Sequence, residues 1–157
     1  MRTLPPTPRY HRVLAALDAS EDAADVLAHA IHLAQVHHAR LTLLVIVPPT
    51  SAWAGSRPEG AALHAEVEAL FARELAQARD AVPEDVSVTT ILDHGHPAAR
   101  ILARLREGAF DVVILGSRGH GGLRAAADSV SLKVLHHSPV PVLVVRIPHP
   151  HDAPGPQ

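Results

Sequence analysis

Five short apolar runs, separated by longer segments with helical periodicity, make up the hydrophobic pattern of this chain. The runs span residues 12–17, 41–47, 86–92, 111–115 and 142–145. Nearly continuous apolar runs of this length predict strands that are buried on both faces of a sheet. The run at 86–92 alternates more clearly between apolar and polar residues, so we expect it at an edge of the sheet.

The segments between these runs predict four helices, each with one apolar face. The first follows residues 18–22, where Ser20 or Asp18 can cap it and acidic residues suit the positive helix end. Pro97 suits the first position of the third helix, and the fourth begins near Asp128 or Ser129. The predicted apolar positions are, in chain order, Ala23, Leu27, Ala30, Ile31 and Ala34; Leu63, Val67, Leu70, Phe71 and Ala78; Ile101, Leu102 and Leu105; and Val130, Val134 and Leu135.

Strands that alternate with helices predict an α/β fold with a doubly wound, five-stranded parallel sheet, a Rossmann-like three-layer sandwich. Ligands of such sheets bind beyond the carboxyl ends of the strands, where the winding reverses. If the strand order is 3-2-1-4-5, the turns at Asp18 and Gly116 flank that point. We expect one domain over residues 11–147, with flexible, proline-rich segments at 1–10 and 148–157.

Composition narrows the classes of function. The chain has 157 residues, 47% of them apolar and only 3% aromatic, which predicts an aliphatic core. A net charge of −2 gives no basic surface for nucleic acid, and the absence of cysteine excludes disulfides and thiolate zinc sites. No run approaches the roughly 20 apolar residues that span a bilayer, so we expect no membrane association and a cytoplasmic protein.

The glycine-rich segment 116–122 (GSRGHGG) carries the clearest chemical signal. It lies between a predicted strand and a predicted helix. Glycine allows close backbone approach, and a helix N-terminus favours an anion, so this layout is typical of a phosphate or nucleotide pocket. A tight strand-to-helix turn without a ligand is the alternative interpretation.

Across nearly all of residues 11–147, the sequence resembles a universal stress protein domain. The matching segments are 13–20 (VLAALDAS), 95–97 (GHP), 116–123 (GSRGHGGL), 129–130 (SV) and 133–145 (KVLHHSPVPVLVV). The resemblance implies the strand order 3-2-1-4-5 and a homodimer that pairs the last strands, here Val142, Leu143, Val144 and Val145. One branch of the family binds ATP, and the resemblance to that branch implies a site for ATP.

The ATP-binding branch shows a glycine, two residues, a second glycine, nine residues, a third glycine and then Ser or Thr. Gly116 and Gly119 match its beginning, but counting nine residues from Gly119 lands on Ser129. With one residue deleted, Asp128 takes the glycine position and Ser129 the Ser/Thr position, and we prefer this register. A carboxylate there repels a triphosphate by roughly 1 kcal/mol at 4 Å in water, and by several times more in a drier pocket.

By this resemblance the nucleotide site comprises Ala16, Asp18, Ile46, Gly116, Arg118, Gly119, Ser129 and Val130. Ala16 and Ile46 would line an adenine pocket, although both also suit an ordinary sheet core. Asp18 could bind a ribose hydroxyl or help hold a metal, or it could cap the first helix. Asp128 also suits a helix N-cap, where it would replace the phosphate. The expected cofactor is ATP or AMP with Mg²⁺, and adenosine or no ligand remain alternatives.

The thirteen histidines form no zinc motif, and we interpret them as solvated surface residues. The sequence shows no nucleophile–base arrangement and no Walker lysine, so it gives no basis for a catalytic assignment. We therefore expect a stress-response or signalling module, in which a bound nucleotide orders the 116–128 loop and alters a surface read by another, unknown protein. The alternatives are a nucleotide-independent dimer and a slow ATPase.

Overall fold

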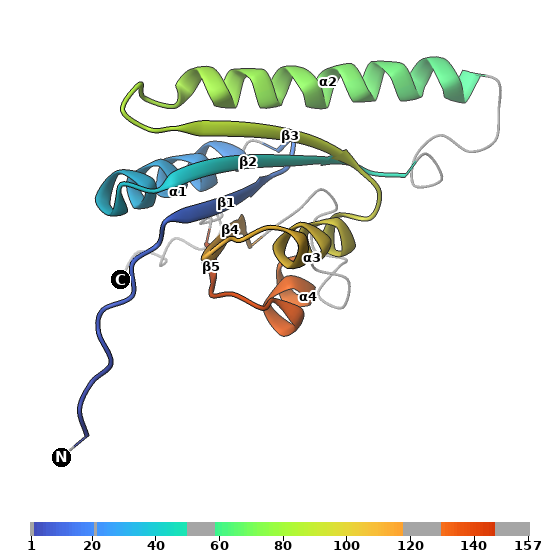
Figure 1. The fold of residues 1–157 in the computed structure, drawn as a ribbon. Helices are drawn as coiled ribbons and strands as arrows, with labels where there is room; N and C mark the ends of the chain where they lie inside the picture. Colours follow the sequence, from blue (N-terminus) through green and yellow to red (C-terminus); the bar gives the residue numbers. More distant parts are fainter. Residues whose placement is uncertain (1, 21, 50–58, 118–129, 147–157) are drawn as a thin grey trace, which may run out of the picture.

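The computed structural model describes residues 2–20, 22–49, 59–117 and 130–146. Strands and helices alternate along these ranges (Figure 1). Their order is β1 (Arg12–Leu17), α1 (Ala23–His37), β2 (Arg40–Val47), α2 (Glu59–Ala81), β3 (Val88–His94), α3 (Pro97–Glu107), β4 (Val112–Gly116), α4 (Val130–His137) and β5 (Val142–Val145). Of the predicted N-terminal segment 1–10, residues 2–10 lie within these ranges. The predicted C-terminal segment 148–157 lies outside the described residues.

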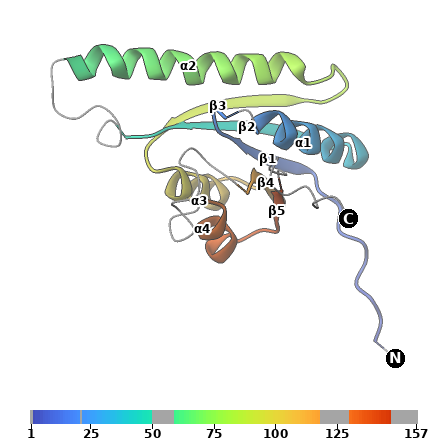
Figure 2. The ribbon, with the colours of Figure 1, turned by 180° about the vertical axis from the view of Figure 1, so that it is seen from behind.

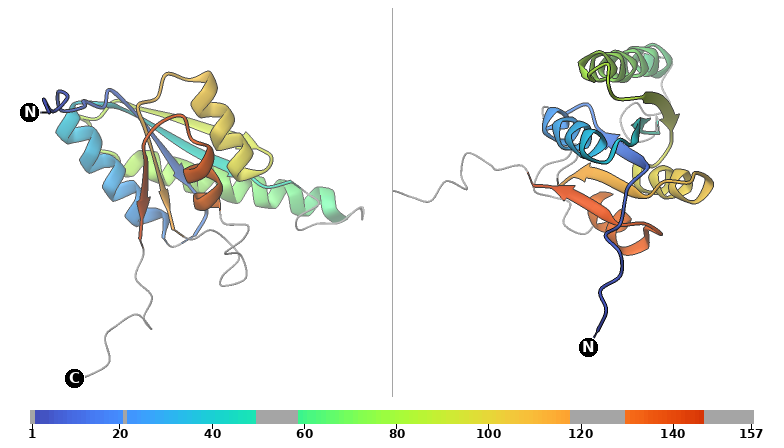
Figure 3. Two further views of the ribbon diagram at one scale, coloured as in Figure 1. Left: turned by 90° about the horizontal axis from the view of Figure 1, so that it is seen from below. Right: turned by 60° about the vertical axis from the view of Figure 1, so that its left-hand side comes forward.

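The five strands form one parallel sheet in the order β3-β2-β1-β4-β5. The predicted doubly wound α/β sandwich and its strand order are therefore confirmed. As expected, β3 lies at an edge of the sheet. Helices α1 and α2 cover one face, and α3 and α4 cover the other (Figures 2 and 3).

The core consists of two aliphatic clusters, one on each face of the sheet. Successive side chains of a strand point to opposite faces. In β1, Val13, Ala15 and Leu17 therefore pack toward α1 and α2, whereas Leu14 and Ala16 pack toward α3 and α4. Among the described residues no polar or charged residue is buried, and Phe71 is the aromatic residue in the buried core.

The amino ends of the two central strands are held together by one carboxylate. Asp111 Oδ2 accepts hydrogen bonds from the backbone N–H groups of His11 (2.6 Å) and Arg12 (2.9 Å). The Asp111 N–H in turn donates to the Arg12 carbonyl. These bonds fix β4 beside β1 at the amino ends of the strands, whereas the predicted site lies at their carboxyl ends.

Two local predictions are corrected by the structure, and a third is confirmed. The N-cap of α1 is Asp22, and no side chain caps this helix, so neither Ser20 nor Asp18 fills that role. The third strand begins at Val88 rather than at residue 86, because Val86 lies in a turn whose N–H donates to the Pro83 carbonyl. Pro97 does begin α3, as predicted.

The predicted apolar stripe of α2 is partly wrong. Leu63 and Leu70 are 40% and 42% exposed, and the face that packs on the sheet is formed by Val67, Phe71, Leu75 and Ala78. Residues 63 and 70 lie at one border of that stripe, and the first turns of α2 extend past the strands (Figure 1). In α4, Val134 is fully buried but Leu135 is 53% exposed.

Candidate functional site

The carboxyl ends of the two central strands part from one another. β1 pairs with β4 only from Val13 to Ala15, opposite Val112 to Ile114. Beyond these residues β1 still pairs with β2 through Leu17, and β4 still pairs with β5 through Gly116. The pairing of β1 with β4 therefore ends early, at the point where the winding of the sheet reverses and where doubly wound sheets carry their ligand crevice.

Both turns that the sequence predicts at this point do leave the sheet at the same edge. Asp18 directly follows β1, and Gly116 is the last residue of β4. Ser117 continues from Gly116 and donates its N–H to the Val145 carbonyl at 2.9 Å, which draws the chain toward β5 and away from β1. Asp18 and Gly116 are both half-buried and thus partly accessible to solvent.

Asp18 is held in a defined conformation by a local turn. Its Oδ1 accepts a hydrogen bond from the Ser20 backbone N–H at 3.2 Å and a second one from the Ser20 hydroxyl. This is an Asx-type turn, which fixes the carboxylate at the end of β1. A carboxylate in this position can accept hydrogen bonds from ligand hydroxyl groups.

Ala16 and Ile46 lie on the same face of the sheet, toward α3 and α4. Ala16 pairs with Leu44 of β2, and Ile46 is two residues further along that strand. Ile46 is only 7% exposed, while Ala16 is half-buried. These two side chains form part of an apolar surface near the carboxyl ends of β1 and β2.

A charged network beside Ile46 was missed by the sequence analysis. Asp93 pairs in register with Ile46, so its side chain lies on the same face of the sheet. Asp93 Oδ2 accepts hydrogen bonds from Arg100 Nε (3.1 Å) and Nη2 (2.9 Å) and from Arg104 Nε (2.9 Å). Asp93 Oδ1 accepts one from the His94 backbone N–H at 2.8 Å. The two arginines, four residues apart, thereby hold α3 against the end of β3.

This network shifts the Asp93 pKa. Partial burial raises the pKa, but the hydrogen bonds from Arg100, His94 and Arg104, together with the Arg104 charge, outweigh it and lower the value from 3.8 to about 2. The same contact raises the pKa of Arg100, mainly through the hydrogen bond to Asp93 and its charge. The network is therefore fully charged near neutral pH.

The short turn after β3 requires glycine. Gly95 has a φ of +127°, a conformation that other residues rarely adopt. Its N–H donates to the Val47 carbonyl at 3.0 Å, which joins the turn to the end of β2. The turn thus sets where α3 begins relative to Ile46.

Several predicted site residues lie outside the described residues: Arg118, Gly119, Ser129 and also Asp128. Their flanks are described. Gly116 ends β4, and Val130 begins α4 and packs partly against the cluster that contains Ile46.

Two of the described histidines lie beside the same carboxylate, Glu68. Glu68 of α2 lies 3.5 Å (Oε2) from His64 Nε2 in the same helix and 3.2 Å (Oε1) from His94 Nε2 at the end of β3. The second contact joins α2 to β3. Within the described part of the chain, no group of three or more ligating side chains could hold a metal ion. In the same residues, no helix is long and apolar enough to cross a bilayer.

A five-stranded parallel sheet with helices on both faces and the order β3-β2-β1-β4-β5 defines a doubly wound α/β protein of the Rossmann-like class, in which ligands bind at the switch point. The universal stress protein family matches this chain over residues 9–146. The chain therefore belongs to the universal stress protein family. The universal stress protein YxiE of Bacillus subtilis is 34% identical over 147 residues, which cover 87% of this chain and 99% of that protein.

Solved structures agree with this assignment. The universal stress protein UspA of Lactobacillus plantarum is 26% identical, with a TM-score of 0.74 over 89% of this chain and all of that one. A universal stress protein crystallised in complex with cAMP is 20% identical, with a TM-score of 0.65 over 88% of this chain and 98% of that one. At this identity the second likeness concerns the fold.

Proposed function

We propose that this universal stress protein is a cytoplasmic signalling module that binds an adenine nucleotide in the crevice between β1 and β4. The observation that carries the proposal is the early end of β1–β4 pairing, which leaves Ala16 and Gly116 beside an open edge. The adenine would pack on Ala16 and Ile46, and the Asp18 carboxylate would accept hydrogen bonds from the ribose.

The phosphates would lie between the glycine-rich segment that follows Ser117 and the start of α4 at Val130. Strand, glycine-rich turn and helix N-terminus together favour an anion. A metal ion such as Mg²⁺ would reduce the repulsion between Asp128 and a triphosphate. We therefore infer that AMP suits this site better than ATP when no metal is added.

Calorimetry with ATP and AMP, each with and without Mg²⁺, tests this proposal. The Asp128→Gly variant should bind ATP about fivefold more tightly or better, because one repulsive charge is removed. Asp128→Asn is the matched control for charge alone, and it should recover most of this gain. Equal or weaker ATP binding by both variants would contradict charge repulsion as the obstacle.

The ligand series should include cAMP, since one solved structure with this fold is a cAMP complex. Phosphate release at saturating ATP tests the slow-ATPase alternative in the same samples.

Nucleotide binding would order the 116–128 loop and so change the surface offered to a protein partner. Slower hydrogen exchange in that loop with saturating nucleotide would support this step.

A nucleotide-independent dimer is the second candidate, and the edge formed by β5 favours it. β5 pairs with β4 on one side only. Leu132, Leu135 and Leu143, from α4 and β5, are 41%, 53% and 40% exposed. An unpaired strand edge beside exposed leucines is suited to pairing with a second copy of the chain. In that case Asp128 would serve as an internal substitute for phosphate.

A further inference from the structure

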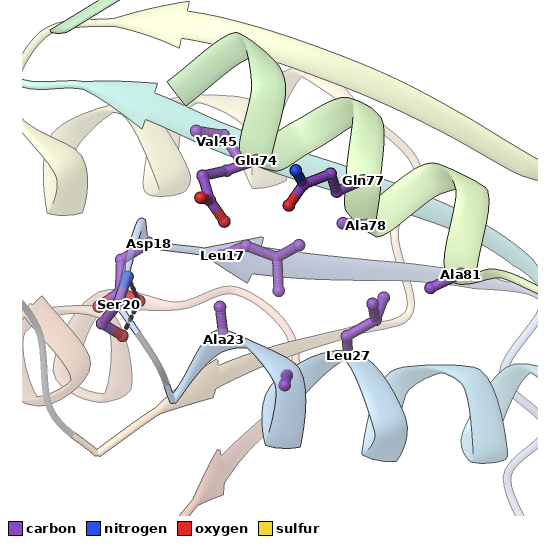
Figure 4. A pocket seen from close by; sticks show the side chains of 11 residues that line it. Leu17, Asp18, Ser20, Ala23, Leu27, Val45, Glu74, Gln77, Ala78 and Ala81 are labelled. Carbon is purple, nitrogen blue, oxygen red and sulfur yellow. Dashed lines mark hydrogen bonds between the residues drawn. The ribbon is translucent and has the colours of Figure 1, made fainter. Parts of the chain in front are cut away.

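A cavity of about 290 Å³ lies between α1 and α2, on the face of the sheet opposite Ala16 and Ile46 (Figure 4). Its floor is formed by the buried side chains of Leu17, Val45 and Leu27. This volume is at the lower end of the range for small-molecule pockets. The cavity is thus separate from the proposed nucleotide pocket, although Asp18 lies at the rim of both.

Small side chains keep the two helices from filling this space. Ala23 and Ala24 face the cavity from α1, and Ala78 and Ala81 face it from α2. Among the described lining residues, Leu27 is the one large apolar side chain that the two helices contribute. The lower part of the cavity is therefore an apolar slot that an alkyl chain can enter.

The open end of the cavity is polar and carries negative charge. Asp18 and Ser20 line it from the end of β1, and Glu74 and Gln77 line it from α2. Figure 4 shows the Glu74 carboxylate and the Gln77 amide directed from α2 toward β1. The described lining includes two carboxylates and no Lys, Arg or His. The charge of this rim favours a cation over an anion.

We propose that this cavity binds a small primary amine with an apolar body of about six carbon atoms, a size suited to a pocket of this volume. The ammonium group would lie between Glu74 and Asp18, where charge-assisted hydrogen bonds form to both carboxylates. The alkyl chain would lie on Leu17, Val45 and Leu27. Nothing in this proposal requires the nucleotide site to be occupied.

Protonated n-hexylamine is the probe that tests this proposal, with 1-hexanol and hexanoate as neutral and anionic controls of the same length. Methyl NMR spectra should show shifts at Leu17, Leu27 and Val45, with the Ile46 methyls on the opposite face unchanged. We expect a Kd on the order of 1 mM for the amine. Binding of the alcohol should be about tenfold weaker, because it lacks the charged hydrogen bonds.

Two kinds of variant separate the charge from the space. Glu74→Gln should weaken amine binding about tenfold and leave alcohol binding unchanged. Glu66→Gln makes the same charge change at an exposed position of α2 outside the cavity, and should have little effect. Ala78→Leu should abolish binding of both ligands, and Ala81→Leu, at an exposed position, serves if Ala78→Leu does not fold.

The proposal is overturned if n-hexylamine shifts none of the three floor residues, or if hexanoate binds equally well. Equal effects of Glu74→Gln and Glu66→Gln would also overturn it, as would unchanged binding in a folded cavity-filling variant. The probe is added to nucleotide-free protein, and the reporting methyl groups lie on the face of the sheet opposite Ile46. The outcome of this experiment is therefore distinguishable from that of the nucleotide titration, although both ligands would contact Asp18.

Discussion

At the scale of single residues, Asp93 joins an edge strand to the helix that follows it. Its side chain is 12% exposed and accepts hydrogen bonds from two arginines of α3. Because its pKa in the folded protein is below its ordinary value, ionised Asp93 stabilises the fold. The contribution is complete above pH of about 4 and is lost as the pH falls toward 2.

Asp93→Asn should therefore lower the free energy of unfolding at pH 7 by roughly 1–2 kcal/mol, after allowance for the partial exposure of the arginines. The difference between the variant and the wild type should shrink as the pH falls from about 4 to about 2. Urea unfolding at pH 7, 4 and 2.5 measures it. Asp80→Asn, at an exposed position, should change stability at pH 7 by less than about 0.5 kcal/mol. A difference for Asp93→Asn that persists at low pH would contradict this account.

The sequence predicts some of these residues and not others, for a physical reason. Asp18 and Gly116 directly follow apolar runs, so their place at the carboxyl edge follows from strand direction alone. Asp93 also ends a strand, but its partners depend on how α3 packs against β3. The contact between Glu68 and His94 depends in the same way on the packing of α2. No local pattern encodes such contacts.

At the scale of elements, the apolar runs locate the strands well because buried parallel strands need apolar residues on both faces. Helix faces are less certain, since periodicity gives the spacing of a stripe but not its borders. For this reason the sequence pattern places Leu63 and Leu70 in the buried stripe of α2, whereas in the structure they border it. The same holds for Leu135 of α4, which is 53% exposed.

The edge strand β5 gives the prediction at this scale. The Pro141 carbonyl accepts a hydrogen bond from the N–H of Val113 in β4, and the Val145 carbonyl accepts one from Ser117, which follows β4. The alternating backbone groups of Val142 and Val144 therefore point outward. Val144→Pro removes one outward N–H and should convert the proposed dimer into a monomer in light scattering after gel filtration. Val144→Thr keeps that N–H and should remain a dimer. A Val144→Pro protein that still dimerises would place the interface elsewhere.

At the scale of the whole molecule, the two faces of the sheet have different chemistry. The face toward α3 and α4 bears Ile46 and the Asp93 network beside the crevice, and the face toward α1 and α2 bears the acidic cavity. The winding rules and the family resemblance together predict the strand order and the position of the crevice. The cavity was not predictable, because it arises where the small residues of two helices distant in sequence face one another.

The most direct test of the central claim is a titration of the labelled protein with AMP, followed by backbone amide NMR. The account predicts saturable shifts that cluster at the ends of the central strands, at residues 16–18, 46–47 and 116–117, on both sides of the β1–β4 opening. Saturable shifts confined to another edge of the sheet, or no shifts with AMP, ATP or cAMP, would contradict it.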